Sequence, residues 1–203
     1  MVTIVGMGPG SKRFITNYAL EKIRKANVLV GGKRHIEEFE DIECEKIIIN
    51  ASTDYSSILK KEGNIVILAS GDPLLYGIAE VILKYVDKDK VEIIPGISSV
   101  QYMCAKLKIT MNDLTIVSLH GRDDDLVKEL KSKKKVAVFT DDKHTPQFIA
   151  SSLKEQDFKD IKIYVGENLS YDMEKIYSFT VEELSNCNIK FDLNVVVITC
   201  GNT

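Results

Sequence analysis

The chain has 203 residues, 44% hydrophobic and 28% charged, a composition typical of folded globular proteins rather than disordered ones. A formal net charge of −3 and a pI of 5.7 argue against chain-wide attraction to nucleic acid or an anionic membrane. No apolar run reaches the ~18 residues of a membrane-spanning segment, and the N-terminus indicates a strand rather than a signal peptide. A cytoplasmic protein is therefore expected.

Strands are predicted in the first half by short runs rich in Val and Ile, at residues 2–5, 27–31, 46–49, 64–69 and 91–95. Segments of helical period separate them. In the first gap, one apolar helix face is formed by Ile15, Ala19, Leu20 and Ile23. This alternation predicts a parallel sheet with helices on both faces.

The second half predicts strands near 115–119, 135–140, 161–165, 174–179 and 194–200, with helices near 123–132 and 145–155. The last two strands lack a long crossover helix, so part of this sheet is expected to be antiparallel. Residues 108–113 lack strong periodicity, which places the domain boundary there. The fold class is therefore two α/β domains, residues 1–110 with a parallel sheet and residues 111–203 with a mixed one.

A glycine-rich turn, Gly-Met-Gly-Pro-Gly at residues 6–10, follows the first strand at the end where open α/β sheets usually bind ligands. The dinucleotide fingerprint fails because Ser11 stands where its last glycine belongs, and no Gly-Lys-Ser/Thr completes a phosphate-binding loop. A tight structural turn and a ligand loop both remain open.

The fourth strand runs into Ser-Gly-Asp-Pro-Leu-Leu-Tyr-Gly at residues 70–77. Asp72 is a good N-cap and Pro73 a good first residue for a helix through Tyr85. Gly71 just before them allows the main chain to approach a ligand. Both roles can coexist.

The fifth strand is followed by Pro-Gly-Ile-Ser-Ser at residues 95–99, where Ser98 and Gln101 have capping-box spacing. A nucleophilic serine is disfavoured, because the G-x-S-x-G elbow is absent and neither His120 nor His144 is marked as its base. The turns that close the first, fourth and fifth strands are expected to converge on one crevice covered by the second half.

Two basic groups also follow strands. Lys33-Arg34-His35 comes after Gly31-Gly32, and His120-Gly121-Arg122 follows the first strand of the second half. For Lys33 a solvated helix start is favoured. The Arg122 guanidinium suits carboxylates, and His120 can titrate near neutral pH. The four cysteines (Cys44, Cys104, Cys187 and Cys200) form no C-x-x-C pair, so neither a disulfide nor a metal site is expected.

In this order the three turns resemble those of the tetrapyrrole methylases, which carry V-G-x-G-P-G, G-D-P-x-x-Y-G and P-G-x-S-S. The matching residues here are 5–10, 71–77 and 95–99, and the resemblance covers nearly the whole chain. Within the family the sequence is most similar to the corrin-pathway C5-methyltransferases, on residues 31–35, 96–101 and 118–122 and on its short length.

The resemblance implies S-adenosylmethionine as methyl donor, held between the two halves, and S-adenosylhomocysteine as product. It implies cobalt-precorrin-7 as acceptor and cobalt-precorrin-8 as product, in the anaerobic branch of cobalamin biosynthesis. The positions that match the family's donor site are Pro9, Gly71, Asp72, Leu75, Ser98, Ser99 and Thr140.

The tetrapyrrole side would be formed by Gly8, Arg34, His35, His120 and Arg122, with Arg13 as a further candidate. The acceptor's acetate and propionate groups require local cations in a protein of net negative charge. Methyl transfer from a sulfonium depends mainly on alignment, so no catalytic residue and no general base is predicted.

A homodimer is expected from the family. Some relatives carry a fused methyltransferase that acts at C15 with decarboxylation, so a separate protein is expected to supply that activity here. The alternatives are a tetrapyrrole methylase acting on another precorrin carbon or on uroporphyrinogen, a diphthine or ribosomal RNA methylase, and a non-enzymatic corrinoid-binding protein. The acidic pI and residues 71–73 disfavour RNA. Donor binding would separate a methylase from a carrier.

Overall fold

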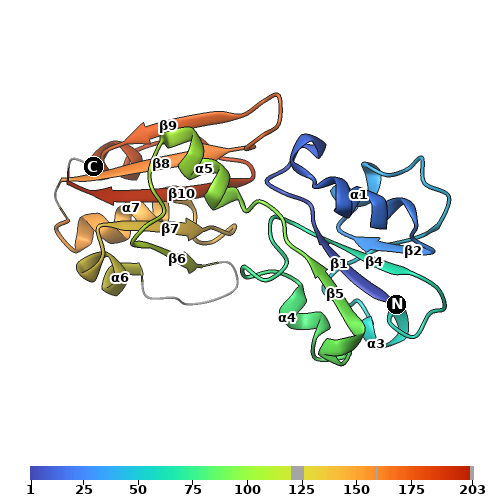
Figure 1. Ribbon diagram of the computed structural model, residues 1–203. Helices are drawn as coiled ribbons and strands as arrows, with labels where there is room; N and C mark the ends of the chain where they lie inside the picture. Colours follow the sequence, from blue (N-terminus) through green and yellow to red (C-terminus); the bar gives the residue numbers. More distant parts are fainter. Residues whose placement is uncertain (120–125, 159, 202–203) are drawn as a thin grey trace. The chain divides into compact units, whose positions relative to one another are not determined.

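The computed structural model describes residues 1–119, 126–158 and 160–201. The chain divides into two compact units, Met1–Ser98 and Ser99–Thr203, each with its own five-stranded sheet (Figure 1). The prediction of two α/β units, one parallel and one mixed, is confirmed. Each unit is described by itself below.

The sheet of the first unit is parallel throughout, in the order β3-β2-β4-β1-β5. Each strand ends within one residue of the predicted bounds. The strands are β1 (Val2–Gly6), β2 (Val28–Gly31), β3 (Glu45–Ile48), β4 (Ile65–Ala69) and β5 (Val91–Ile94).

Helices cover both faces of this sheet because its strands are apolar on both sides. On one face, Val5 and Leu29 pack with α1 (Asn17–Arg24) and α2 (Lys33–Glu37), and with Ile15, which follows the 3-10 turn η1 (Lys12–Phe14). On the other, Ile4 and Val30 pack with α3 (Tyr55–Ile58) and α4 (Ala79–Ile82). The predicted face of α1 is confirmed, since Ala19 and Ile23 are fully buried. A short 3-10 turn, η2 (Lys88–Lys90), precedes β5.

The sheet of the second unit is mixed, in the order β6-β7-β10-β8-β9. β6 and β7 are parallel, whereas β10 is antiparallel to both of its neighbours and β9 is antiparallel to β8, as predicted for the last strands. The strands are β6 (Leu114–Ser118), β7 (Lys135–Phe139), β8 (Ile161–Glu167), β9 (Lys175–Phe179) and β10 (Asn194–Cys200).

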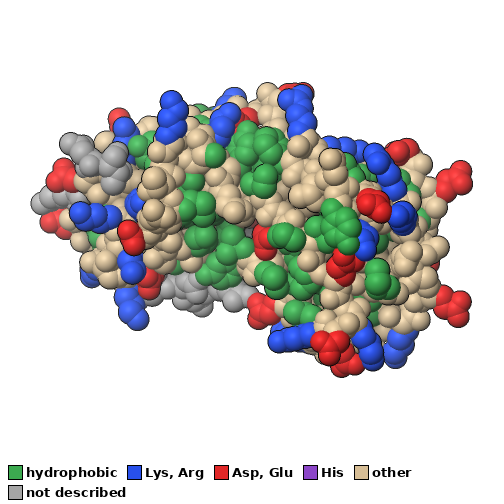
Figure 2. Space-filling view, in the orientation of Figure 1, with side chains coloured by type: hydrophobic (Ala, Val, Ile, Leu, Met, Phe, Trp, Pro, Cys, Tyr) green, Lys and Arg blue, Asp and Glu red, His purple; other side chains and the backbone are tan. Residues whose placement is uncertain are grey.

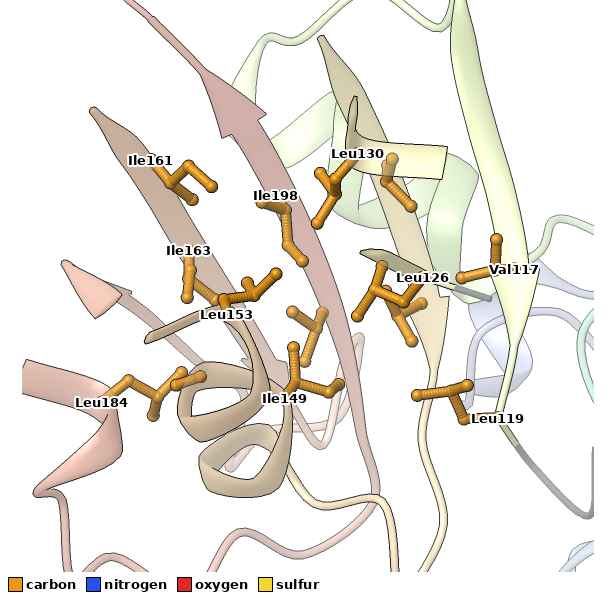
Figure 3. Packing of buried hydrophobic residues seen from close by; sticks show 14 of the residues in the cluster. Val117, Leu119, Leu126, Leu130, Ile149, Leu153, Ile161, Ile163, Leu184 and Ile198 are labelled. Atoms are coloured by element: carbon orange, nitrogen blue, oxygen red, sulfur yellow. The ribbon is translucent and has the colours of Figure 1, made fainter. Parts of the chain in front are cut away.

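One face of this sheet is covered by α6 (Leu126–Ser132), α7 (Pro146–Glu155) and α8 (Val181–Ser185). Figure 3 shows Ile149 and Leu153 on the side of α7 that faces the strands carrying Ile163 and Ile198. All four side chains are fully buried, so this helix is fixed by its apolar stripe.

The opposite face is covered by α5 (Ser99–Leu107), which decides where the chain divides. Val100, Met103 and Cys104 of this helix are buried against the side chains of Ala137, Val195 and Val197 of the second sheet. The units therefore divide between Ser98 and Ser99, and not at 110/111 as the loss of periodicity suggested.

The helix predicted from Asp72 through Tyr85 is wrong in its first part. Regular helix begins at Ala79 and ends at Ile82, and turns replace it over residues 73–78. Gly77 explains the tightness of these turns, since a Cβ there would lie 2.3 Å from the Pro73 carbonyl oxygen. The local propensity of Asp72 and Pro73 favours a helix start, but the tight turn that follows prevents a regular helix before Ala79.

The four cysteines are free thiols, of which Cys104 is buried. Among the described residues, no helix is long and apolar enough to cross a membrane. Figure 2 shows Lys and Arg side chains interspersed with Asp and Glu on the visible surface of each unit.

Candidate functional site

The carboxyl edge of the first sheet has the topology of a ligand site at β1 and β4. These two strands are neighbours, but the chain leaves β1 toward β2 across one face, through α1, and leaves β4 toward β5 across the other, through α4. The connections therefore depart in opposite directions. In open α/β sheets, ligands bind in the crevice at such a switch point.

The turns after β1 and β4 are joined there by their main chains. Gly8 and Gly71 form an isolated antiparallel bridge, in which the Gly71 N–H donates to the Gly8 carbonyl at 3.0 Å and the Gly8 N–H donates back at 3.3 Å. The Met7 N–H donates to the Ala69 carbonyl at 2.8 Å. Both bridge glycines have positive φ, +78° and +63°, which a larger residue adopts at a cost.

The turn after β5 lies against the same two turns. A Cβ at Gly6 would lie 2.4 Å from the Gly96 nitrogen, and one at Gly96 would lie 2.3 Å from the Gly71 carbonyl oxygen. Such distances leave no room for any side chain. The expectation that the turns of the first, fourth and fifth strands converge is confirmed within this unit.

Asp72 fixes the spacing of two of these turns. One carboxylate oxygen accepts from the Leu74 N–H at 2.9 Å and the other accepts from the Gly96 N–H at 3.1 Å. The side chain expected to cap a helix therefore bridges the turns after β4 and β5. The structure thus makes Asp72 a positioning residue of the edge.

Most residues predicted for the donor side lie at this edge. Pro9 is buried in the turn after β1, Leu75 is half-buried after β4, and Ser98 is buried after β5. A Cβ at Gly71 would lie 3.6 Å from the Ser98 Cα, an ordinary contact. Ser99 follows as the first residue of α5, in the second unit.

The remaining donor-side candidate, Thr140, follows β7 in the second unit. Its hydroxyl lies 2.9 Å from the Asn194 Oδ1 and 3.1 Å from the Asn194 carbonyl oxygen, at the start of β10. Because β7 and β10 are antiparallel, the end of one strand lies beside the start of the other. This pairing holds Thr140 in place.

A buried acid supports the same end of the second sheet. Glu167 is 7% exposed and accepts from the Asp192 N–H at 2.8 Å and from the Tyr177 hydroxyl at 3.2 Å. Burial and then the charge of Glu167 raise the pKa of Tyr177, so its hydroxyl keeps the proton it donates. The Asn194 amide in turn donates to the Asp192 carbonyl at 2.7 Å.

Sequence reasoning missed Glu167 and Asn194. Both stand inside predicted or extended strand runs, where the apolar pattern dominated. The available signal was a polar residue at the end of one apolar run, Glu167, and another at the start of the last run, Asn194. A buried polar group at the end of a strand normally has a hydrogen-bond partner.

The predicted substrate-side residues are only partly described. Arg34 and His35 lie in α2, and Gly8 lies in the bridge after β1. His35 is buried, and burial, with the nearby Arg34 charge, lowers its pKa to about 4. His35 is therefore neutral at pH 7 and Arg34 is the cation of this pair. His120 and Arg122 lie outside the described residues.

The structure defines a two-unit α/β protein in which three glycine-containing turns meet at the carboxyl edge of the first sheet. Residues 1–185 match the profile of the Tetrapyrrole (Corrin/Porphyrin) Methylases. The chain belongs to this family of methyltransferases.

Similar proteins agree with this membership. The chain is 39% identical to the cobalt-precorrin-7 C(5)-methyltransferase of Salmonella typhimurium, over 98% of each chain. It is 34% identical to a probable cobalt-precorrin-7 C(5)-methyltransferase of Methanocaldococcus jannaschii, over 94% of each. Its fold matches uroporphyrin-III C-methyltransferase from Thermus thermophilus, solved with S-adenosylhomocysteine, with a TM-score of 0.80, 17% identity, and coverage of 98% of this chain and 96% of that one.

Proposed function

We propose that this protein transfers a methyl group from S-adenosylmethionine to C5 of cobalt-precorrin-7, giving cobalt-precorrin-8 in cobalamin biosynthesis. The observation that carries the proposal is the 39% identity to the Salmonella enzyme of that name, over 98% of both chains. The coverage of both chains supports the proposal, because no large part of the Salmonella enzyme lacks a counterpart in this chain.

The charge of the converging turns suits a sulfonium donor. Residues 5–10, 70–77 and 94–99 contain a single charged side chain, Asp72, and it is acidic. A strongly basic loop would repel a positive sulfonium, whereas main-chain groups and one carboxylate do not. Gly71 also lies beside Ser98, since a Cβ on it would be 3.6 Å from the Ser98 Cα. These residues fit the donor.

The bound donor supplies an activated methyl group, whose bond to sulfur breaks as the bond to the acceptor carbon forms. The protein's contribution is alignment, which can lower a barrier by ~7–11 kcal/mol in well-oriented systems. Asp72 contributes by holding the Leu74 and Gly96 main chains at a fixed spacing. Its two oxygens already accept these N–H groups, so we assign it no proton transfer.

The acceptor's carboxylates require cations. Among the residues that the structure describes, Arg34 in α2, just after β2, is a candidate. Arg122, His120 and the exposed Arg13 complete the proposed set, with Gly8 facing the macrocycle and His35 contributing as a neutral group. The proposal includes a homodimer and a separate protein for C15 methylation with decarboxylation.

The decisive experiment is anaerobic incubation of the protein with cobalt-precorrin-7 and S-adenosylmethionine carrying a ¹³C-labelled methyl group. NMR should place one new methyl at C5. A methyl at another ring carbon would move the protein elsewhere in the family. Binding of the tetrapyrrole without binding of the donor would make it a carrier and contradict the proposal.

Two substitutions test the division of the site. Asp72→Ala releases two main-chain groups of the donor-side turns and should weaken S-adenosylhomocysteine binding about tenfold, a loss of ~1.4 kcal/mol, while leaving tetrapyrrole affinity unchanged. Arg122→Ala should do the reverse. Calorimetric titration of each variant with both ligands measures the effect, and a swapped pattern would refute these assignments.

A further inference from the structure

Three large apolar side chains are exposed on the converging turns of the first unit. Leu74 is 65% exposed, Tyr76 is 41% exposed and Ile97 is 38% exposed. The two turns that carry them are held together, because the Asp72 carboxylate accepts from both the Leu74 N–H and the N–H of Gly96, the neighbour of Ile97. Apolar side chains gathered at a ligand edge are typical of binding surfaces.

Tyr76 is also held in an unfavourable backbone conformation. Its φ is +52°, in the left-handed region that bulky residues seldom adopt. The turn imposes this angle: the Leu75 N–H donates to the Asp72 carbonyl at 3.4 Å, and the Ala79 N–H donates to the Pro73 carbonyl at 3.2 Å. Glycine would adopt the same angle without cost.

Burial recovers only part of that cost, because much of the Tyr76 side chain remains in solvent. Lys108 offers a comparison, with a φ of +58° and an exposed side chain. It directly follows α5, where a left-handed residue commonly ends a helix, so its backbone role needs no side chain. No helix ends at Tyr76, so a helix cap does not account for its backbone angle.

Exposure alternates along these turns. Leu74 and Tyr76 are exposed whereas Leu75 between them is half-buried, and Ile97 is exposed whereas Ser98 is buried. The inward set is the one proposed for the donor. In-line transfer requires the acceptor on the other side of the methyl group, so the outward set suits the acceptor.

We propose that Tyr76, with Leu74 and Ile97, forms an apolar platform on which one flat face of the tetrapyrrole acceptor packs. The inference rests on the proposed function and names the surface that recognises its substrate. A macrocycle presents a broad apolar face with carboxylates at its rim, and an aromatic ring packs well against such a face. The platform carries no charge, which leaves the rim to cations such as Arg34.

The test uses three variants of the full chain: Tyr76→Gly, Tyr76→Phe and, as a control for backbone relief, Lys108→Gly. Each is titrated anaerobically with cobalt-precorrin-7 and separately with S-adenosylhomocysteine, and its thermal unfolding is recorded. Tyr76→Gly should bind the tetrapyrrole at least about tenfold more weakly, a loss of ~1.4 kcal/mol. It should bind S-adenosylhomocysteine within about twofold of wild type, with an unfolding midpoint that is unchanged or raised.

Tyr76→Phe keeps the ring and should bind both ligands as wild type does. Lys108→Gly should match Tyr76→Gly in stability but retain tetrapyrrole affinity. Tetrapyrrole binding by Tyr76→Gly at the wild-type level would overturn the inference, as would a joint loss of both ligands with a lowered midpoint. The proposed function fails separately, if the wild-type protein itself does not bind cobalt-precorrin-7.

Discussion

The two units fix their strand ends by different means. In the first unit, parallel strands end at the same edge, so the turns after β1, β4 and β5 meet and are joined through their main chains at Gly6, Gly71 and Gly96. In the second, β7 ends where the antiparallel β10 begins, and side chains such as Thr140 and Asn194 make the connection. The junction at these three glycines leaves no room for a Cβ at Gly6 or Gly96, and one carboxylate, that of Asp72, braces it from the side. The second arrangement depends on side chains throughout.

The largest expected effect comes from adding a methyl group to the main-chain junction. Gly6→Ala would place a Cβ 2.4 Å from the Gly96 nitrogen and 2.8 Å from the Gly71 carbonyl oxygen. Because both contacts are main chain, the sheet edge must shift, and we expect a loss of ~3 kcal/mol or more with loss of donor binding. Denaturant unfolding and calorimetric titration with S-adenosylhomocysteine measure both.

Gly32→Ala is the matched control. Gly32 has a φ of −63°, and apart from its chain neighbours no heavy atom of the described residues lies within 4 Å of a Cβ built there. Its stability should change by less than ~1 kcal/mol. Equal stability of the two variants would show that the main-chain junction of the first unit does tolerate a side chain.

A second effect depends on pH, because the first unit buries a titratable side chain, His35, in α2. The pKa of His35 falls from 6.5 to about 4 through burial. The unfolded chain therefore binds more protons between these pH values, and stability should fall as the pH drops from 6.5 toward 4, by up to ~3 kcal/mol. His35→Gln should flatten this slope in denaturant unfolding, whereas Lys33→Gln, exposed on the same helix, should retain it.

The smallest expected effect lies in the second unit. Glu167→Ala removes the acceptor for the Tyr177 hydroxyl and the Asp192 N–H, and we expect a loss of ~2 kcal/mol in the free energy of unfolding. Glu167→Gln keeps one carbonyl acceptor and should lose about half as much. Ser178→Ala, exposed on β9, is the control. An unchanged Glu167→Ala protein would show that side chains do not hold this end of the sheet.

Much of the fold could be predicted because its signals are local. Each strand of the first sheet is a short run of Val and Ile, and the pattern located all five to within a residue. The glycine turns were found for the same reason, since they follow these strands directly. Their meeting at one edge followed from the parallel arrangement.

Two errors have the opposite cause. The apolar face of α5 was visible in the sequence, but periodicity does not specify which sheet buries it, and Val100 and Met103 pack on the second. The Asp72-Pro73 pair has the propensity to begin a helix, yet the Asp72 carboxylate reaches Gly96, a residue far along the chain. Neither contact has a local signature.

The sequence by itself determined which residues alternate toward a core, where the chain turns, and which family its turns resemble. Only the tertiary structure decided that His35 is buried and that Asp72 bridges two turns. It also decided that Tyr76 adopts a left-handed backbone conformation with a partly exposed side chain. The reason is that local patterns set each residue's preference for burial and conformation. Contacts between distant residues depend instead on strand order and on how closely the packed main chains approach.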